Sequence, residues 1–194
     1  MTRSGRALIA GVDEAGRGPL AGPVVAAAVI LDPGKPIPGL ADSKTLSAQR
    51  REALACHIYE RALAVQVSVV DVEQIDQINI LQATLKAMTI AIEALEPRPL
   101  LARVDGNRAP RSSVPVQTIV GGDGSDRAIA AASIIAKTHR DALMEQLHER
   151  YPDYGFDRHK GYPTPAHLEV LKAIGPCPAH RQSFRPVFQA RLFE

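Results

Sequence analysis

The sequence predicts an α/β fold, a mixed five-stranded sheet flanked by helices with a helical extension at the C-terminus. Apolar, β-branched runs near the start of the chain are followed by longer segments whose apolar residues recur at helical spacing. A chain of 194 residues that is 45% hydrophobic and 23% charged is large enough for one buried core. Because aromatic residues make up only 4% and Trp is absent, that core must consist mainly of Ala, Val, Ile and Leu.

Apolar runs predict the strands of the sheet. They lie at residues 7–12, 23–31, 64–70, 100–104 and 114–120. The glycine-rich segment GRGPLAG joins the first two runs, so we expect a turn there. The early strands are followed by helices that alternate with single strands, which indicates a sheet of mixed direction.

Helices are predicted from apolar periodicity and from their end signals. The segments are 48–63, 79–95, 126–151 and a shorter one that begins at residue 165. Ser47 and Thr164 are the expected N-caps, and Pro165 occupies the first helical position, where proline is favoured. Pro97 and Pro99 should end the second of these helices, because proline disrupts the hydrogen bonds of a helix interior.

The chain shows no internal repeat and no domain boundary before about residue 155. We therefore expect residues 1–155 to form one domain and residues 156–194 a helical extension that is not an independent domain. No run of about 18 apolar residues occurs, so no transmembrane helix is expected. The apolar patch near the start runs directly into Asp13 and Glu14, so it is not expected to be a signal peptide.

Cysteine usage and charge narrow the class of protein. Cys56 and Cys177 are far apart in the sequence, which fits a cytoplasmic protein better than a disulfide scaffold. Cys177 and His180 have a zinc-like spacing but lack further ligands nearby, so zinc is not expected. The net charge of +2 argues against purely electrostatic binding of nucleic acid, yet residues 158–194 carry six Lys or Arg against two Asp or Glu. Basic segments are usually solvated, but beside isolated carboxylates they suit an enzyme that acts on phosphodiesters.

Carboxylates fall where the predicted strands end. Asp13 and Glu14 follow the first strand, Asp105 follows the fourth, and Asp123 follows the fifth within GGDGSD. Loops at strand ends converge over a rigid scaffold, so these acids are expected to face one site. Side chains of consecutive residues on a straight strand point to opposite faces, so we expect a bend at the glycines that follow Glu14.

Clustered carboxylates repel one another unless a cation lies between them. Oxygen ligands suit Mg²⁺ or Mn²⁺ rather than Zn²⁺, and two such ions can hydrolyse a phosphodiester bond. The alternative is that these acids are turn or cap residues, as we expect for Asp126 at the start of the long helix.

Sequence segments spread over nearly the whole chain occur in a recognisable order. They are GVDEAGRGPLAGPVV (11–25), DSKTLS (42–47), VDGN (104–107), AAASIIAKTHRD (130–141), HKGYPTPAH (159–167) and HRQSF (180–184). Together they resemble ribonuclease HII, the type 2 ribonuclease H, in its bacterial form. The resemblance implies an RNase H-like catalytic domain over residues 1–155 and a substrate-binding extension over residues 156–194. It also implies endonucleolytic cleavage of the RNA strand of RNA–DNA hybrids and incision at ribonucleotides embedded in duplex DNA. A two-metal mechanism would leave 3′-hydroxyl and 5′-phosphate ends.

The resemblance also implies the site residues. The catalytic, metal-binding residues, which would hold two Mg²⁺ or Mn²⁺ ions during catalysis, are Asp13, Glu14, Asp105 and Asp123. The substrate-binding residues are Gly16, Arg17, Gly18, Ser43, Lys44, Asn107 and Tyr162. Among these, the GRG motif resembles a ribonucleotide sensor, Tyr162 a junction sensor, and Ser43 with Lys44 a phosphate site. Without the family, a tight turn and a core aromatic residue are the plainer interpretations of GRG and Tyr162.

Other residues keep alternatives open. Asn107 either orients Asp105 or binds the substrate backbone, and Lys137 has a phosphate-binding or structural role. Gly121 departs from the basic residue that the family often has before Gly122, which implies a weaker local phosphate contact.

The expected partners are RNA–DNA hybrids and ribonucleotide-containing duplex DNA, with no membrane and a monomeric protein. Residues 189–193 resemble the Gln-x-x-Leu-Phe peptide that docks on the replication sliding clamp, although such a Leu-Phe pair can also pack on the protein itself. The rival functions are a hybrid-binding module without hydrolysis, which the carboxylates disfavour, and another nuclease or integrase on the same scaffold.

Overall fold

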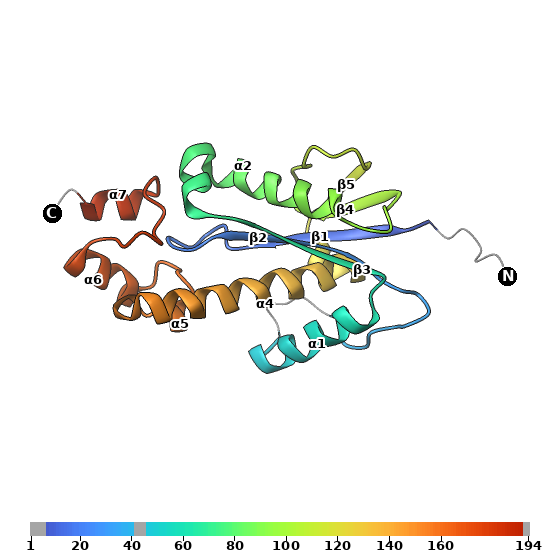
Figure 1. Cartoon of the computed structure of the whole chain (residues 1–194), viewed down its shortest axis with the longest axis horizontal. Coiled ribbons are helices and arrows are strands. Elements are labelled where there is room, and N and C mark those ends of the chain that lie inside the picture. Colours follow the sequence, from blue (N-terminus) through green and yellow to red (C-terminus); the bar gives the residue numbers. More distant parts are fainter. Residues whose placement is uncertain (1–6, 41–45, 192–194) are drawn as a thin grey trace.

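A single mixed sheet forms the centre of the computed structural model, which describes residues 7–40 and 46–191 (Figure 1). Its strands are β1 (Ile9–Ala15), β2 (Val24–Ile30), β3 (Ala64–Val70), β4 (Leu101–Asp105) and β5 (Val116–Ile119). The strand order is β3-β2-β1-β4-β5. β1 and β3 pair antiparallel with β2, whereas β4 pairs parallel with β1 and with β5. The predicted five-stranded sheet of mixed direction is confirmed.

Helices cover both faces of this sheet. They are α1 (Ala48–Arg61), α2 (Val72–Glu93), α3 (Gly122–Ser125), α4 (Arg127–Arg150), α5 (Phe156–His159), α6 (Pro165–Ile174) and α7 (Arg185–Arg191), with a 3₁₀ turn at Pro152–Tyr154. Figure 1 shows α2 on one face and α4 with α1 on the other. The short helices α5 to α7 gather at one end of the sheet (Figure 1), as expected for a C-terminal helical extension.

Two apolar layers lie on the two faces of the sheet, and smaller buried clusters lie among the C-terminal helices. Alternate residues of β2, which is buried throughout, contribute to the layer beneath α2 and to the layer beneath α1 and α4. Gly11 allows α4 to lie directly on β1, because a Cβ at this position would be 2.0 Å from the carbonyl carbon of Ala128. This close approach brings the first turns of α4 next to the end of β1.

Several predicted helix ends are confirmed. The side chains of Ser47, Asp126 and Thr164 each accept a hydrogen bond from a backbone N–H in the first turn of α1, α4 and α6. Pro165 occupies the first turn of α6, as predicted. Asp126 is therefore a cap residue, and an ion pair with Arg103 at 2.8 Å holds it further.

Other boundaries differ from the prediction. β1 continues to Ala15 rather than ending at residue 12, so Asp13 and Glu14 lie on the strand itself. α2 begins at Val72, directly after the N-cap Asp71, whereas the periodicity predicts a start at residue 79. Asn79 has a non-helical φ of 67°, and its side chain accepts hydrogen bonds from the N–H groups of Leu81 and Gln82. The predicted start is thus an internal cap at a kink, and the turns before it were missed.

Helices α3, α5 and α7 were not predicted, because each is too short for apolar periodicity to show. Among residues 7–40 and 46–191, no helix is both long enough and apolar enough to cross a membrane.

Candidate active site

A cavity of about 230 Å³ lies where β1 and β4 end. It brings together seven residues singled out in the sequence: Asp13, Glu14, Gly16, Arg17, Gly18, Asp105 and Tyr162. These residues come from two strands, the turn after β1 and the segment between α5 and α6. The cavity therefore joins the acidic residues to the proposed sugar-reading residues.

Pairing of the central strands places the acids side by side. The parallel pairing of β1 with β4 ends at Val12 and Val104, so Asp13 and Asp105 each follow the last pair. Glu14 is still part of the strand, because it pairs with Ala26 of β2, and β1 ends just before Gly16, the first of the glycines at which a bend is expected. Glu14 nevertheless reaches the cavity, since β4 has ended and leaves that edge of β1 open.

Backbone amides fix the carboxylates. The N–H of Glu14 donates to Oδ1 of Asp13 at 2.7 Å, and the N–H of Gly122 donates to Oδ1 of Asp105 at 2.7 Å. Glu14 lies 3.4 Å from the guanidinium of Arg17. Asp13 is therefore held by the backbone of its own strand, and Asp105 by the backbone at the start of α3.

Burial and mutual repulsion destabilise the charged carboxylates. Burial, and then the charges of Glu14 and Asp105, raise the pKa of Asp13 well above its ordinary value. Burial also raises the pKa of Glu14, and the Asp105 charge adds to this, although the Arg17 charge opposes it. A cation between these side chains would reverse the effect.

The donor chemistry of the cavity fits a divalent cation, because its acidic ligands are all oxygen. Within the described residues, no three His, Cys, Asp or Glu side chains are placed to hold an ion as they stand. The carboxylates are thus gathered at one cavity without forming a closed ligand shell.

Tyr162 and the glycine turn also line the cavity. Gly16 is buried and has a φ of 100°, whereas Arg17 and Gly18 are exposed. A Cβ on Gly18 would lie 3.4 Å from Cε1 of Tyr162, so the ring lies directly against this glycine. Tyr162 is 43% exposed, which excludes the interpretation as a core aromatic residue.

Other predicted residues do not line the cavity. Asp123 lies on α3 and is buried, one residue after the glycine that donates to Asp105. Asn107 is exposed beyond the end of β4. Ser43 and Lys44 lie outside the described residues.

Helix α4 contributes cavity residues that the sequence analysis missed or left without a defined role: Ser133, Lys137 and Arg140. Their spacing of four and three residues places them on one face of a helix, and this polar stripe in an Ala-rich segment is the signal in the sequence. Ser133 also hydrogen-bonds the Asp13 side chain.

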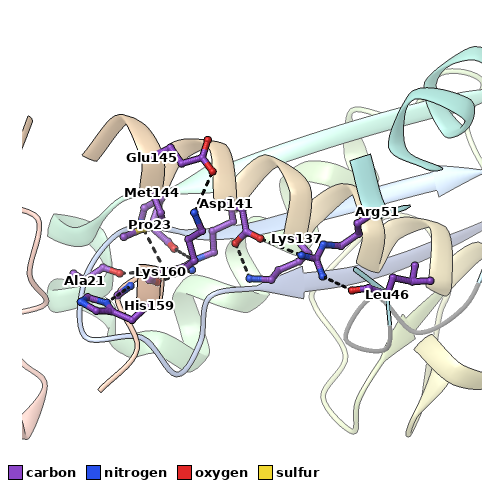
Figure 2. Close-up of polar contacts among 12 residues, drawn as sticks. Ala21, Pro23, Leu46, Arg51, Lys137, Asp141, Met144, Glu145, His159 and Lys160 are labelled. Carbon is purple, nitrogen blue, oxygen red and sulfur yellow. Dashed lines mark hydrogen bonds and ion pairs between the residues drawn. The ribbon is translucent and has the colours of Figure 1, made fainter. Parts of the chain in front are cut away.

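Lys137 is connected to the segment that precedes α1. Its Nζ lies 2.6 Å from Asp141, which in turn lies 3.6 Å from Arg51 (Figure 2). Arg51 donates to the carbonyl oxygen of Leu46 at 3.3 Å. This chain of contacts runs from the cavity to the residue that follows the DSKT segment.

Known proteins are similar to this chain in both sequence and fold. The family model for Ribonuclease HII matches residues 10–190. A Ribonuclease HII of Dechloromonas aromatica is 61% identical over 93% of this chain and 92% of its own length. One of Bordetella pertussis is 59% identical over 93% of this chain and 90% of its own length.

Solved structures agree with these sequence matches. The ribonuclease H2 of Pyrococcus horikoshii has a TM-score of 0.82 and 28% identity, covering 95% of this chain and 97% of its own. RNase HII in the PCNA complex from Archaeoglobus fulgidus has a TM-score of 0.79, 30% identity and the same coverage. Bst-RNase HIII in complex with Mn²⁺ has a TM-score of 0.70 and 21% identity, covering 96% of this chain and 70% of its own, and shows the fold alone. The chain therefore belongs to the ribonuclease HII family, and it is an RNase H endonuclease.

Proposed function

We propose that this protein, acting in the cytoplasm, cleaves the RNA strand of RNA–DNA hybrids and also incises duplex DNA at single embedded ribonucleotides. The observation that carries the proposal is one cavity lined both by the acids Asp13, Glu14 and Asp105 and by the GRG turn with Tyr162. The acids suit metal-dependent hydrolysis of a phosphodiester. The turn and the tyrosine suit contact with a ribose 2′-hydroxyl, the group that distinguishes RNA from DNA.

Asp13, Glu14 and Asp105 would hold Mg²⁺ or Mn²⁺, two ions during catalysis, with Asp123 as the fourth ligand. The raised pKa values of Asp13 and Glu14 support this assignment, because a nearby cation favours the charged carboxylates. When bound, such ions lower the pKa of the attacking water and neutralise charge on the departing oxygen, which leaves 3′-hydroxyl and 5′-phosphate ends. The chain keeps the acids oriented through the N–H groups of Glu14 and Gly122.

We assign substrate contacts both to the catalytic domain of residues 1–155 and to the extension of residues 156–194, which is not an independent domain. Glycines at positions 16 and 18 let main-chain groups approach the ribose closely, and the Tyr162 ring supports the neighbouring sugar. Ser43 and Lys44 would hold a phosphate, and Asn107 the substrate backbone or Asp105.

Cleavage by an Asp13→Asn variant tests the nuclease assignment. With Mg²⁺ or Mn²⁺, the variant should lose cleavage of an RNA–DNA hybrid by on the order of 10³-fold, because it loses a charged ligand. Hybrid binding should remain, since the turn and Tyr162 are unchanged. End-group analysis of the wild-type products checks the polarity of cleavage.

Asp126→Asn is the matched control, because it makes the same change of charge at the cap of α4. Asn caps helices about as well as Asp, so this variant should cleave normally. Normal turnover by Asp13→Asn would reject the proposal.

Specificity for the embedded ribonucleotide is tested with Tyr162→Ala. The variant should lose more activity on duplex DNA with one ribonucleotide than on an all-RNA–DNA hybrid, because the single sugar offers no alternative contact. Tyr59→Ala, an exposed tyrosine on α1, serves as the control. Equal loss on both substrates would show that Tyr162 does not sense the junction.

The end of the chain carries a separate proposal, docking on a sliding clamp through residues 189–193. Gln189 is exposed near the end of α7, whereas Leu192 and Phe193 lie outside the described residues. The complex of the Archaeoglobus fulgidus RNase HII with PCNA supports this partner. A pull-down with purified bacterial sliding clamp should succeed with the full chain and fail without its last six residues.

A further inference from the structure

Two fully buried arginines lie behind the glycine turn. Arg140 on α4 is 1% exposed, and Arg181 in the segment before α7 is 0% exposed. Neither forms an ion pair within residues 7–40 and 46–191. Burial lowers the pKa of Arg140 to about 10 and that of Arg181 to about 9. A buried cation without a carboxylate is costly unless hydrogen bonds replace its water, so the partners of these groups are informative.

Main-chain carbonyl oxygens surround both guanidinium groups. Arg181 donates to those of Gly16 (2.6 Å), Arg17 (3.1 Å), Gly22 (2.8 Å) and Pro23 (3.3 Å). Arg140 donates to those of Ala21 (3.1 Å), Pro23 (3.1 Å) and Lys160 (3.0 Å), which Figure 2 labels. The two arginines thus bind the whole loop from β1 to β2 from its buried side.

These bonds determine the direction of the peptide groups in the GRG turn. In a planar trans peptide the N–H points away from the preceding C=O, and both peptides of the turn are trans. Since the carbonyls of Gly16 and Arg17 point toward Arg181, the N–H groups of Arg17 and Gly18 point away from it. Neither amide has an acceptor among the described residues. Both amides are therefore free to contact a ligand.

Arg140 also connects the segment that carries Tyr162 to this loop. Arg140 joins Pro23 to Lys160, two residues before Tyr162, and the N–H of Leu20 donates to the carbonyl of Gly161 at 2.8 Å. Gly16 has no room for a side chain, because a Cβ there would lie 2.1 Å from Nε of Arg140. The Arg140 guanidinium and this main-chain hydrogen bond therefore fix the tyrosine segment relative to the turn.

We propose that Arg140 and Arg181 are positioning residues that determine ribonucleotide specificity. Arg181 turns the carbonyls of the GRG turn inward, so that the amides of Arg17 and Gly18 face the substrate sugar, and Arg140 fixes Tyr162 beside it. This role rests on the proposed incision at embedded ribonucleotides. Neither arginine needs to touch the substrate.

Arg181→Lys and Arg140→Lys test this role, because lysine keeps the charge but cannot donate in several fixed directions. The readout is kcat/KM on duplex DNA with one ribonucleotide divided by kcat/KM on an all-RNA–DNA hybrid, corrected for the folded fraction. We expect this ratio to fall by about tenfold or more, with hybrid cleavage reduced far less. In Arg181→Ala, guanidinium ion at non-denaturing concentration should restore the ratio and methylammonium should not.

Ile92→Ala is the control for lost stability, since Ile92 is buried on α2 at the other face of the sheet. It should leave the ratio unchanged. The positioning role is overturned if both lysine variants have the same ratio as Ile92→Ala. It is also overturned if both variants fail to fold, because the guanidinium groups would then be required only for the fold. If the wild type does not incise the single-ribonucleotide duplex, the proposed function fails instead.

Discussion

The acidic cavity and the histidine cluster of the C-terminal extension both bury ionisable groups, but they do so in opposite ways. The cluster consists of His159, His167 and His180, together with Cys177. In the cavity, burial and neighbouring charges raise the pKa of Asp13, so its charged form is disfavoured. In the cluster, burial lowers the pKa of each histidine, to about 4 for His180, so the neutral form of each ring is favoured.

Every ring nitrogen in the cluster has a partner that fits the neutral form. Nδ1 of His167 lies 2.9 Å from the carbonyl oxygen of Tyr162 and must donate to it, so its Nε2 accepts from Nε2 of His180 at 3.0 Å. Nδ1 of His180 then accepts from the N–H of Cys177 at 3.1 Å. His159 donates to the carbonyl of Tyr154 and accepts from the N–H of Gly161.

This contrast indicates that the histidine cluster stabilises the fold, whereas the carboxylates of the cavity are retained for chemistry. The cluster satisfies its polar atoms and holds the segment that carries Tyr162. The cavity retains repulsion that the protein alone does not relieve, and such a cost to stability is typical of functional sites. The predictions below act on this contrast.

The largest effect is expected from removing one charge of the cavity, in Asp105→Asn. Metal-dependent cleavage should fall by on the order of 10³-fold, because the acids would act together on the same ions. The free energy of unfolding without metal should not fall, since the Asn side chain can still accept from the N–H of Gly122 and repels neither Asp13 nor Glu14. Cleavage within tenfold of the wild type would contradict the assignment.

A smaller effect, on stability alone, is expected in the cluster. A histidine whose folded pKa is lowered stabilises the fold fully above its unfolded value of about 6.5 and loses this contribution as pH falls. For His180 the loss between about pH 6.5 and 4 amounts to about 3 kcal/mol. His180→Asn keeps an acceptor for the N–H of Cys177 and does not titrate, so its free energy of unfolding should be lower at neutral pH but less dependent on pH.

Urea unfolding at a series of pH values measures this effect. His57→Asn, an exposed histidine on α1, is the control and should keep the wild-type pH dependence. Since His159 and His167 also have lowered pKa values, the variant should retain part of the slope. An unchanged slope in His180→Asn would show that its ring does not resist protonation in the fold.

The five strands could be predicted from the sequence because each is a short apolar run that can be recognised from its own residues. The β-branched run at residues 64–70 predicts β3 with its observed ends. Cap residues such as Ser47 and Thr164 act through hydrogen bonds within one turn, so they too are readable. The kink at Asn79 is not, because a periodic pattern shows the apolar face of a helix and not a break in its backbone.

The sequence predicted the residues of the candidate site that lie at strand ends. It did not predict those whose contacts join segments far apart in the sequence. Asp13 and Asp105 could be paired from the expected strand ends alone. Arg181 could not be linked to the glycine turn, since its bond to Gly16 joins residues 165 positions apart. Its burial also runs against the usual expectation that arginine is exposed.

The smallest expected effect is a gain in stability from Asp13→Asn without metal. Because the folded pKa of Asp13 is raised, the folded protein binds more protons than the unfolded chain just above pH 3.8, and stability falls as pH rises through that window. The charged carboxylate therefore costs stability at neutral pH, and its removal should gain about 1 kcal/mol, or about 2–4 °C in Tm. Thermal unfolding with chelator at pH 7 measures the gain, which should vanish at acidic pH, where the wild-type carboxyl is itself neutral. Mn²⁺ should stabilise the wild type more than the variant. The opposite result is a variant that is less stable than the wild type without metal and is stabilised equally by Mn²⁺. It would show that the Asp13 carboxylate stabilises the fold, as the histidines do.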